Sequence, residues 1–186
     1  MDEKGIQLGV GKRVLALVDR DQKVVQQVED GNRELVTVIE CVCADGTAIP
    51  PSVVYQGARR DLEWGRDNPC KARYVNSSIS HSPKGWTDQE LGSAWLERDF
   101  EPFTAAKNKS QGYRLLILDG HNSHTTYRFC SFADRHKIIV LCLPSHTTHR
   151  LQPCDVGVFG PLNSTWKSEV NAASMEWISI RKHNLL

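Results

Sequence analysis

Arg114-Leu115-Leu116-Ile117-Leu118, followed at once by Asp119-Gly120, is the stretch that decides the fold. A continuous apolar run that stops at a turn dipeptide is typical of a strand buried on both faces. A helix is predicted next, over residues 126–136, and a second apolar run covers 138–143 and ends at Pro144. Strand, helix and strand within about 30 residues make a βαβ unit, so the two strands should be parallel.

A hairpin is predicted on the N-terminal side of this unit. Residues 34–44 are rich in β-branched side chains and end at Asp45-Gly46, a turn dipeptide. A second β-rich run, Ser52 to Gln56, follows and closes at Gly57. Two such runs joined by a loop with glycine and proline indicate two antiparallel strands.

The remaining N-terminal segments are less regular. A shorter strand is expected either at residues 13–18 or at residues 24–28. Residues 61–82 are polar, and we interpret them as a loop with one short strand near Tyr74.

Two further helices complete the predicted order. Thr87 and Glu90 have the spacing of a capping box, so a helix is expected from Asp88 to Phe100, with Pro102 as its stop. Another helix should begin near residue 156. The whole order predicts one α/β domain over residues 1–186, with a mixed sheet and helices packed on it.

Composition sets the class of protein. The chain has 186 residues, 40% hydrophobic and 24% charged, which is ordinary for a globular domain. No apolar run approaches the roughly 20 residues that span a membrane, and no secretion signal opens the sequence. The six cysteines contain no CxxC pair and are expected to be reduced. Since the net charge is only +1, a nucleic acid would have to bind at a local basic patch. The basic residues that could form such a patch are Arg59, Arg60, Arg66, Lys71, Arg73, Lys107 and Lys109. Alternatively, these residues lie in solvated loops.

Three aspartates stand at the edges of apolar or glycine-containing segments: Asp2, Asp119 and Asp155. Asp119 follows a buried strand, where open α/β sheets bind their ligands. Asp155 precedes a predicted helix, so capping of the first turn would also explain it. If folding brings the three carboxylates together, they repel one another unless a cation lies between them, and a hard ion such as Mg²⁺ would suit them. Such a cluster is typical of metal-assisted phosphodiester chemistry.

The histidines suggest alternatives. His121 and His124, and likewise His146 and His149, have the spacing H-x-x-H and lie in predicted loops near Cys154. Imidazoles and a thiolate could bind zinc, although no helical HExxH pattern supports this. A position behind a carboxylate site, or facing a phosphate, is the favoured interpretation. A Ser-His-Asp hydrolase is disfavoured because GxSxG is absent.

Several long strings closely resemble the DDE-superfamily endonuclease domain of pogo and Tigger transposases and their relatives, jerky and centromere protein B. They are MDEKGIQLG (1–9), TVIECVCADGTAIPPSVVYQG (37–57), SPKGWTDQELGSAWLERDFEP (82–102), LILDGHNSH (116–124) and LPSHTTHRLQPCDVGVFGPL (143–162). The resemblance implies a ribonuclease H-like fold, with Asp2, Asp119 and Asp155 as catalytic ligands of two Mg²⁺ or Mn²⁺ ions. His121, His124, His146 and His149 match positions around that site.

The resemblance also implies DNA as the partner, the nucleus as the compartment and a transposable-element origin, with a homo-oligomer left open. Members carry a helix-turn-helix region upstream, and here only Met1 precedes Asp2. The first central strand is therefore expected to be truncated, with Asp2 on a frayed terminus. Two functions stay open: metal-dependent DNA cleavage and strand transfer, or an inactive, domesticated or decayed DNA-binding module. A zinc-stabilised interaction domain is a third, weaker alternative.

Overall fold

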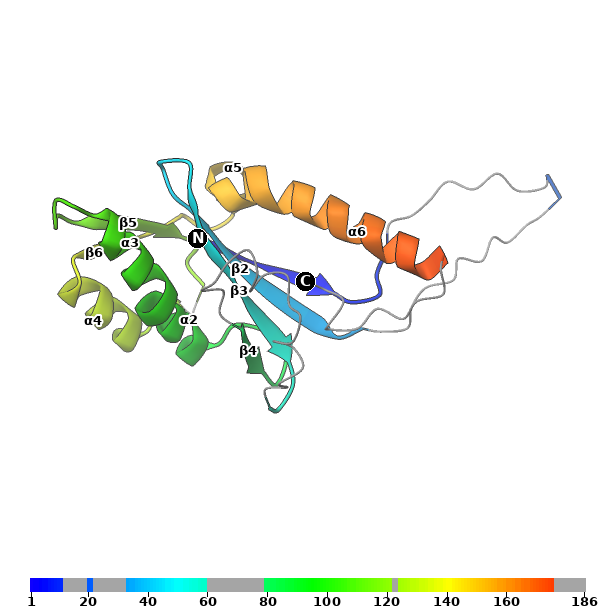
Figure 1. Cartoon of the computed structure of the whole chain (residues 1–186), viewed down its shortest axis with the longest axis horizontal. Helices are drawn as coiled ribbons and strands as arrows, with labels where there is room; N and C mark the ends of the chain where they lie inside the picture. The colour runs from blue at the N-terminus through cyan, green and yellow to red at the C-terminus, as the bar shows by residue number, and fades with distance from the viewer. Residues whose placement is uncertain (12–19, 22–32, 60–78, 122–123, 176–186) are drawn as a thin grey trace.

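The computed structural model describes residues 1–11, 20–21, 33–59, 79–121 and 124–175. Its larger sheet has the strand order β1-β2-β3-β4. The first three strands pair antiparallel, and β4 joins β3 in parallel. The bounds are Asp2–Gln7 for β1, Leu35–Val42 for β2, Ala48–Gln56 for β3 and Ile79–Ser82 for β4. Figure 1 shows these strands as one twisted layer.

The predicted hairpin is confirmed as β2 and β3. At its tip the Asp45 carboxylate accepts a hydrogen bond from the Thr47 backbone N–H at 3.0 Å, and Gly46 has a φ of 83°, a conformation that favours glycine. The expected loop over residues 61–82 is wrong at its end, because β4 begins at Ile79. Strand β4 is short and polar, so its sequence alone does not predict a strand. It forms because it pairs in parallel with β3. The strand expected near Tyr74, and those expected at 13–18 or 24–28, lie outside the described residues.

The predicted βαβ unit is also confirmed. Strand β5 (Arg114–Leu118) pairs in parallel with β6 (Ile138–Cys142), and helix α4 (Tyr127–Arg135) connects them. These strands form a second, two-stranded sheet, where one continuous sheet was expected. The two sheets meet where the Met1 amino group donates to the Ile117 carbonyl oxygen at 2.9 Å.

The helix expected from Asp88 to Phe100 differs at both ends. Helix α2 (Gln89–Trp95) is capped by Asp88, whose carboxylate accepts from the Leu91 N–H at 2.9 Å, while the Thr87 side chain is buried. The chain then continues through π-helix η2 (Leu96–Phe100) into α3 (Glu101–Lys107). Pro102 does not end the helix because it lies in the first turn of α3, where a missing N–H costs little.

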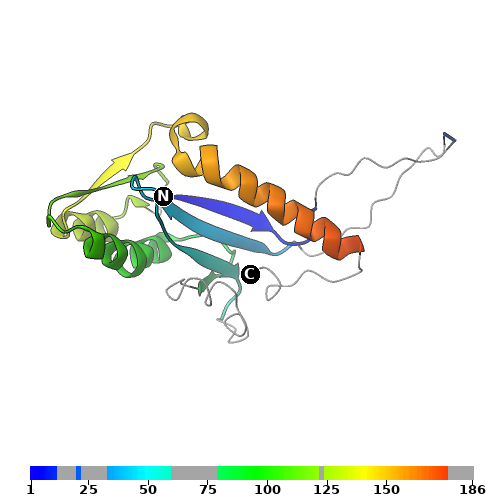
Figure 2. The ribbon, with the colours of Figure 1, turned by 45° about the horizontal axis from the view of Figure 1, so that its top comes forward.

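The C-terminal segments fold as α5 (Thr148–Leu151), π-helix η4 (Cys154–Val158) and α6 (Phe159–Met175), which confirms the helix predicted from about residue 156. Helix α6 lies along one face of the larger sheet (Figure 2). Its Val170 packs there with a buried cluster made of Leu8, Val36, Val53, Tyr55 and Ile79. The other face packs against α2, η2 and the βαβ unit through the main core, which includes Met1, Ile39, Val54, Leu96, Phe100, Leu116, Leu118 and Phe129.

The expected frayed terminus is wrong. Met1 is only 5% exposed and belongs to the main core, and its carbonyl oxygen accepts a hydrogen bond from Gln152 Nε2 at 2.7 Å. Asp2 is already paired with Glu40 in the β1–β2 ladder. Burial of Met1 and pairing of Asp2 hold this end of β1 in place.

Candidate active site

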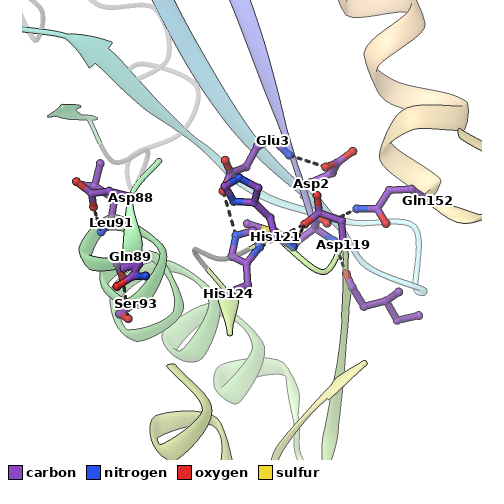
Figure 3. Close-up of polar contacts among 12 residues, drawn as sticks. Asp2, Glu3, Asp88, Gln89, Leu91, Ser93, Asp119, His121, His124 and Gln152 are labelled. Carbon is purple, nitrogen blue, oxygen red and sulfur yellow. Dashed lines mark hydrogen bonds and ion pairs between the residues drawn. The ribbon is translucent and has the colours of Figure 1, made fainter. Parts of the chain in front are cut away.

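The three predicted aspartates come from three separate elements. Asp2 is the first residue of β1, Asp119 directly follows β5, and Asp155 lies in η4. Figure 3 shows Asp2 and Asp119 at the junction of the two sheets, with Gln152 beside them. Folding thus brings the end of β5 to the start of β1, although more than half of the sequence separates them.

Burial raises the pKa of the Asp2 carboxyl to about 6. A hydrogen bond from the Glu3 N–H to Asp2 Oδ1, at 2.8 Å, opposes this shift. The negative charges of Asp155 and Asp119 raise the pKa further. The charges of both other aspartates therefore act on Asp2, and this is the like-charge repulsion expected between carboxylates in one region.

Asp119 is held by the two histidines that follow it. The pKa of its carboxyl is lowered, first by His124 and then, against the cost of burial, by the backbone N–H of His121. The His121 N–H donates to Asp119 Oδ1 at 3.3 Å, and His124 Nδ1 lies 3.4 Å from the same oxygen. The second separation is long for a hydrogen bond, so we describe it as an ion pair. Both contacts involve Oδ1.

His124 is the most buried of these groups, with 1% of its side chain exposed. Its Nε2 lies 3.0 Å from Glu3 Oε1, so the two ring nitrogens face two carboxylates. Burial by itself would lower the pKa of His124, but Asp119 and Glu3 together raise it to about 9. At neutral pH the ring is therefore an imidazolium with a proton on each nitrogen.

Asp155 is held differently. It lies in the first turn of η4, whose N-cap position is Pro153, and among the described residues no side chain caps that turn. The capping interpretation of Asp155 is therefore wrong. Its neighbour Cys154 is buried, and the Cys154 Sγ donates to the Glu40 carbonyl oxygen at 3.7 Å. This contact holds η4 against β2.

The other predicted residues divide into two sets. The structure places His121 and His124 at Asp119, whereas His146 and His149 are exposed, and within the described ranges no contact links them to the three aspartates. The role predicted for this second pair stays a prediction. Lys107 forms an ion pair with Asp45, which favours a structural role for it, and Arg60, Arg66, Lys71 and Arg73 lie outside the described residues.

A divalent cation fits the chemistry of the aspartates. Carboxylate oxygens are the donors that hard cations prefer, and Mg²⁺ needs only one or two of them besides water and phosphate. The repulsion felt by Asp2 is what a bound cation would relieve. The spacing of the aspartates, in contrast, does not form a complete metal site, because in the described part of the chain no group of three His, Cys, Asp or Glu side chains is close enough together to hold a metal ion. The same observation leaves the zinc alternative without support.

Sequence reasoning missed three residues at this site. Glu3 contacts His124, Gln152 binds the backbone of Met1, and Glu40 lies opposite Asp2 in the ladder. Burial raises the pKa of the Glu40 carboxyl to about 7. Only Glu40 gave a local signal, as a charged residue inside an otherwise apolar strand.

Comparison with known proteins identifies the family. Residues 32–185 match the sequence profile of the DDE superfamily endonuclease. The chain is 27% identical over 171 residues to the human protein "Pogo transposable element with KRAB domain", a match that covers 90% of the chain and 26% of the relative. It is 34% identical over 173 residues to "MFS-type transporter clz9" of Cochliobolus lunatus, covering 92% of the chain and 18% of that protein.

The chain thus spans about a quarter or less of the length of the curated relatives it matches. Despite the name of the fungal relative, no helix among the described residues has the length and apolar character to cross a bilayer.

Solved structures show the same fold. A Mos1 transposase paired-end complex with the left transposon end matches with a TM-score of 0.58 and 16% identity, over 97% of this chain and 47% of that one. The Mos1 strand transfer complex matches with a TM-score of 0.54, also at 16% identity, over 99% and 47%. These matches confirm the predicted ribonuclease H-like class. The chain belongs to the DDE superfamily endonuclease family, with pogo transposable-element proteins among its relatives.

Proposed function

We propose that this domain cleaves DNA phosphodiester bonds and transfers strands with the help of divalent cations, through Asp2, Asp119 and Asp155. The observation that carries the proposal is the electrostatic coupling of the three side chains, since Asp155 and Asp119 both raise the pKa of Asp2. The repulsion that Asp119 and Asp155 exert on Asp2 is a cost to the fold that a cation would remove.

The contacts of each aspartate indicate its proposed role at the cation site. Among the described residues, the contacts of the Asp2 and Asp119 carboxylates all involve Oδ1, and we assign Oδ2 of both to a cation. Asp155 approaches from η4 and would complete the set. Two Mg²⁺ or Mn²⁺ ions, when bound, would activate a water molecule or a DNA 3′-hydroxyl as the nucleophile and stabilise the leaving oxygen. Around them, the His124 imidazolium keeps Asp119 ionised.

DNA is the proposed substrate and the nucleus the proposed compartment. The support is family membership, together with the solved Mos1 transposase complex, which by its title contains a transposon end. The overall charge of +1 supplies no general attraction to DNA. We therefore expect modest affinity that falls steeply with salt, as contacts to phosphates require.

The test is nicking of supercoiled plasmid DNA in Mn²⁺ or Mg²⁺. Asp119→Asn should reduce the nicking rate by on the order of 100-fold or more, because it removes an ionised ligand of the cation. The matched control is Asp134→Asn, an exposed aspartate on α4, which should keep the wild-type rate. Nicking by Asp119→Asn at the wild-type rate would overturn the proposal.

One observation favours a second candidate, a DNA-binding module without turnover. The aspartates in the described structure are not gathered into a metal-binding cluster. If that arrangement persists in solution, the protein should retain DNA in a salt-dependent manner, with or without divalent ions, and should yield no nicked product.

A further inference from the structure

Glu3 stands out as a half-buried acidic residue, with 15% of its side chain exposed, that lies beside the predicted triad and is not used by the chemistry above. Neighbouring residues of a strand point to opposite faces of the sheet. On β1, Lys4 lies over the Phe159 ring of α6, with its Nζ 5.8 Å from the ring centroid. Glu3 therefore points to the other face, where it meets His124, as Figure 3 shows.

The His124 ring is enclosed on this face. It is 1% exposed, and its centroid lies 5.8 Å from that of the buried Phe129 ring. An enclosed imidazole still has two orientations about its Cβ–Cγ bond, and its hydrogen-bond partners select one of them. The contact of Nε2 with Glu3 Oε1, at 3.0 Å, selects the orientation in which Nδ1 faces Asp119.

Glu3 thus acts on Asp119 from a distance. The His121 N–H donates to Asp119 Oδ1 at 3.3 Å, and His124 Nδ1 lies 3.4 Å from the same oxygen as an ion pair without a hydrogen bond, so both contacts draw that oxygen toward the histidines. The contact also links β1 to the loop after β5, which are the two elements that supply Asp2 and Asp119. A partner behind a ligand commonly alters metal affinity 10- to 100-fold without touching the metal.

We infer that Glu3 is a positioning residue for the proposed cation site, which through His124 orients the Asp119 carboxylate. The inference rests on the proposed function for the identity of the site. Because the link is a hydrogen bond to Nε2, an amide oxygen in place of the carboxylate should preserve it, whereas a methyl group should abolish it.

The experiment compares Glu3→Ala and Glu3→Gln with wild type. Gln7→Ala, on the exposed end of the same strand, is the matched control. Without metal, nuclear magnetic resonance of the ¹⁵N- and ¹³C-labelled protein reads the His124 ring nitrogens and the Asp119 carboxyl carbon. Mn²⁺ affinity is then measured from the electron paramagnetic resonance signal of the free ion, and thermal melting confirms folding.

Glu3→Ala should shift both resonances and weaken Mn²⁺ binding about 10- to 100-fold, while Glu3→Gln and Gln7→Ala stay within about threefold of wild type. An unshifted Asp119 signal in Glu3→Ala, or Glu3→Gln as impaired as Glu3→Ala, would overturn the inference. If wild type binds no Mn²⁺, the proposed metal function fails, and the resonances of the metal-free protein still decide the role of Glu3. Binding without DNA nicking would likewise count against the proposed function alone.

Discussion

The sheet unit (β1–β4 with α6) and the βαβ unit (β5, α4 and β6) are built on different plans. The sheet unit is covered on both faces, by α6 on one and by the main core on the other. Among the described residues, the βαβ unit is covered on one face only, by the main core. On its other face the side chains of Leu115, Ile139 and Leu141 are 55%, 52% and 47% exposed.

This difference shows what holds the candidate active site together. Asp2 belongs to the sheet unit and Asp119 to the βαβ unit, so their spacing depends on the contact between the units. That contact consists of the main core, the Met1–Ile117 hydrogen bond and the Glu3–His124 pair. Apolar burial supplies most of the free energy of association, and the polar contacts fix the geometry.

The largest effect is expected at the shared core. Leu116→Ala should lower the free energy of unfolding by about 3 kcal/mol, because Leu116 is 2% exposed and its truncation leaves a cavity between the units. Leu115→Ala, on the opposite face of the same strand, is the control and should change it by less than about 0.5 kcal/mol. Urea unfolding followed by circular dichroism measures both. Equal losses would show that the two faces of β5 do not differ as described.

The polar link should appear as a pH dependence of stability. The pKa of His124 is about 9 in the folded protein and near its ordinary value of 6.5 when unfolded. The folded state therefore binds more protons, and the stabilisation present below pH 6.5 is lost as the pH rises through 9. Wild type should lose about 2 kcal/mol between pH 7 and pH 9.

His124→Gln should show little of this slope in the same urea titrations. The titrations stop at pH 9 because burial raises the pKa of the Cys41 thiol to about 11. At higher pH this thiol adds its own pH dependence to the free energy of unfolding. A slope in His124→Gln as steep as in wild type would assign the dependence to other groups.

The smallest effect concerns the start of β1. Gln152→Met keeps the side-chain volume but removes the Nε2 donor from the buried Met1 carbonyl, at a cost of about 1 kcal/mol. Gln7→Met is the control, since Gln7 Nε2 donates to the Arg33 carbonyl oxygen at 3.3 Å on an exposed part of β1. Gln7→Met should leave the free energy of unfolding nearly unchanged. Chemical denaturation measures both variants. Equal losses in the free energy of unfolding would show that burial of the Gln152 hydrogen bond adds nothing to stability.

The sequence predicts the parts of this fold that neighbouring residues encode. The apolar run before Asp119 and the Asp45-Gly46 turn each carry their signal within a few residues, and both the βαβ unit and the hairpin are found where expected. The three candidate aspartates follow from a resemblance to a family. Their mutual electrostatic influence became visible only in the structure.

What escaped prediction joins distant segments. Glu3 and His124 are 121 positions apart, and Met1 and Ile117 are 116 apart, so no periodicity or local motif connects them. The helix beyond Pro102 was missed for a different reason. Proline is read as a helix stop, whereas here the π-helix η2 ends just before it and a new first turn begins.

The π-helix η4 influences where this part of the chain tolerates a change of length. Its widened turn accommodates an additional residue between Gln152 and the start of α6 at Phe159. Deleting one residue there would restore α-helical spacing with little change in the register of α6, whereas deleting one residue from the first turns of α6 itself would turn everything downstream by about 100°. Val170, now 1% exposed beneath the sheet, would rotate away from its cluster. A one-residue deletion should therefore be tolerated better in η4 than in the first turns of α6.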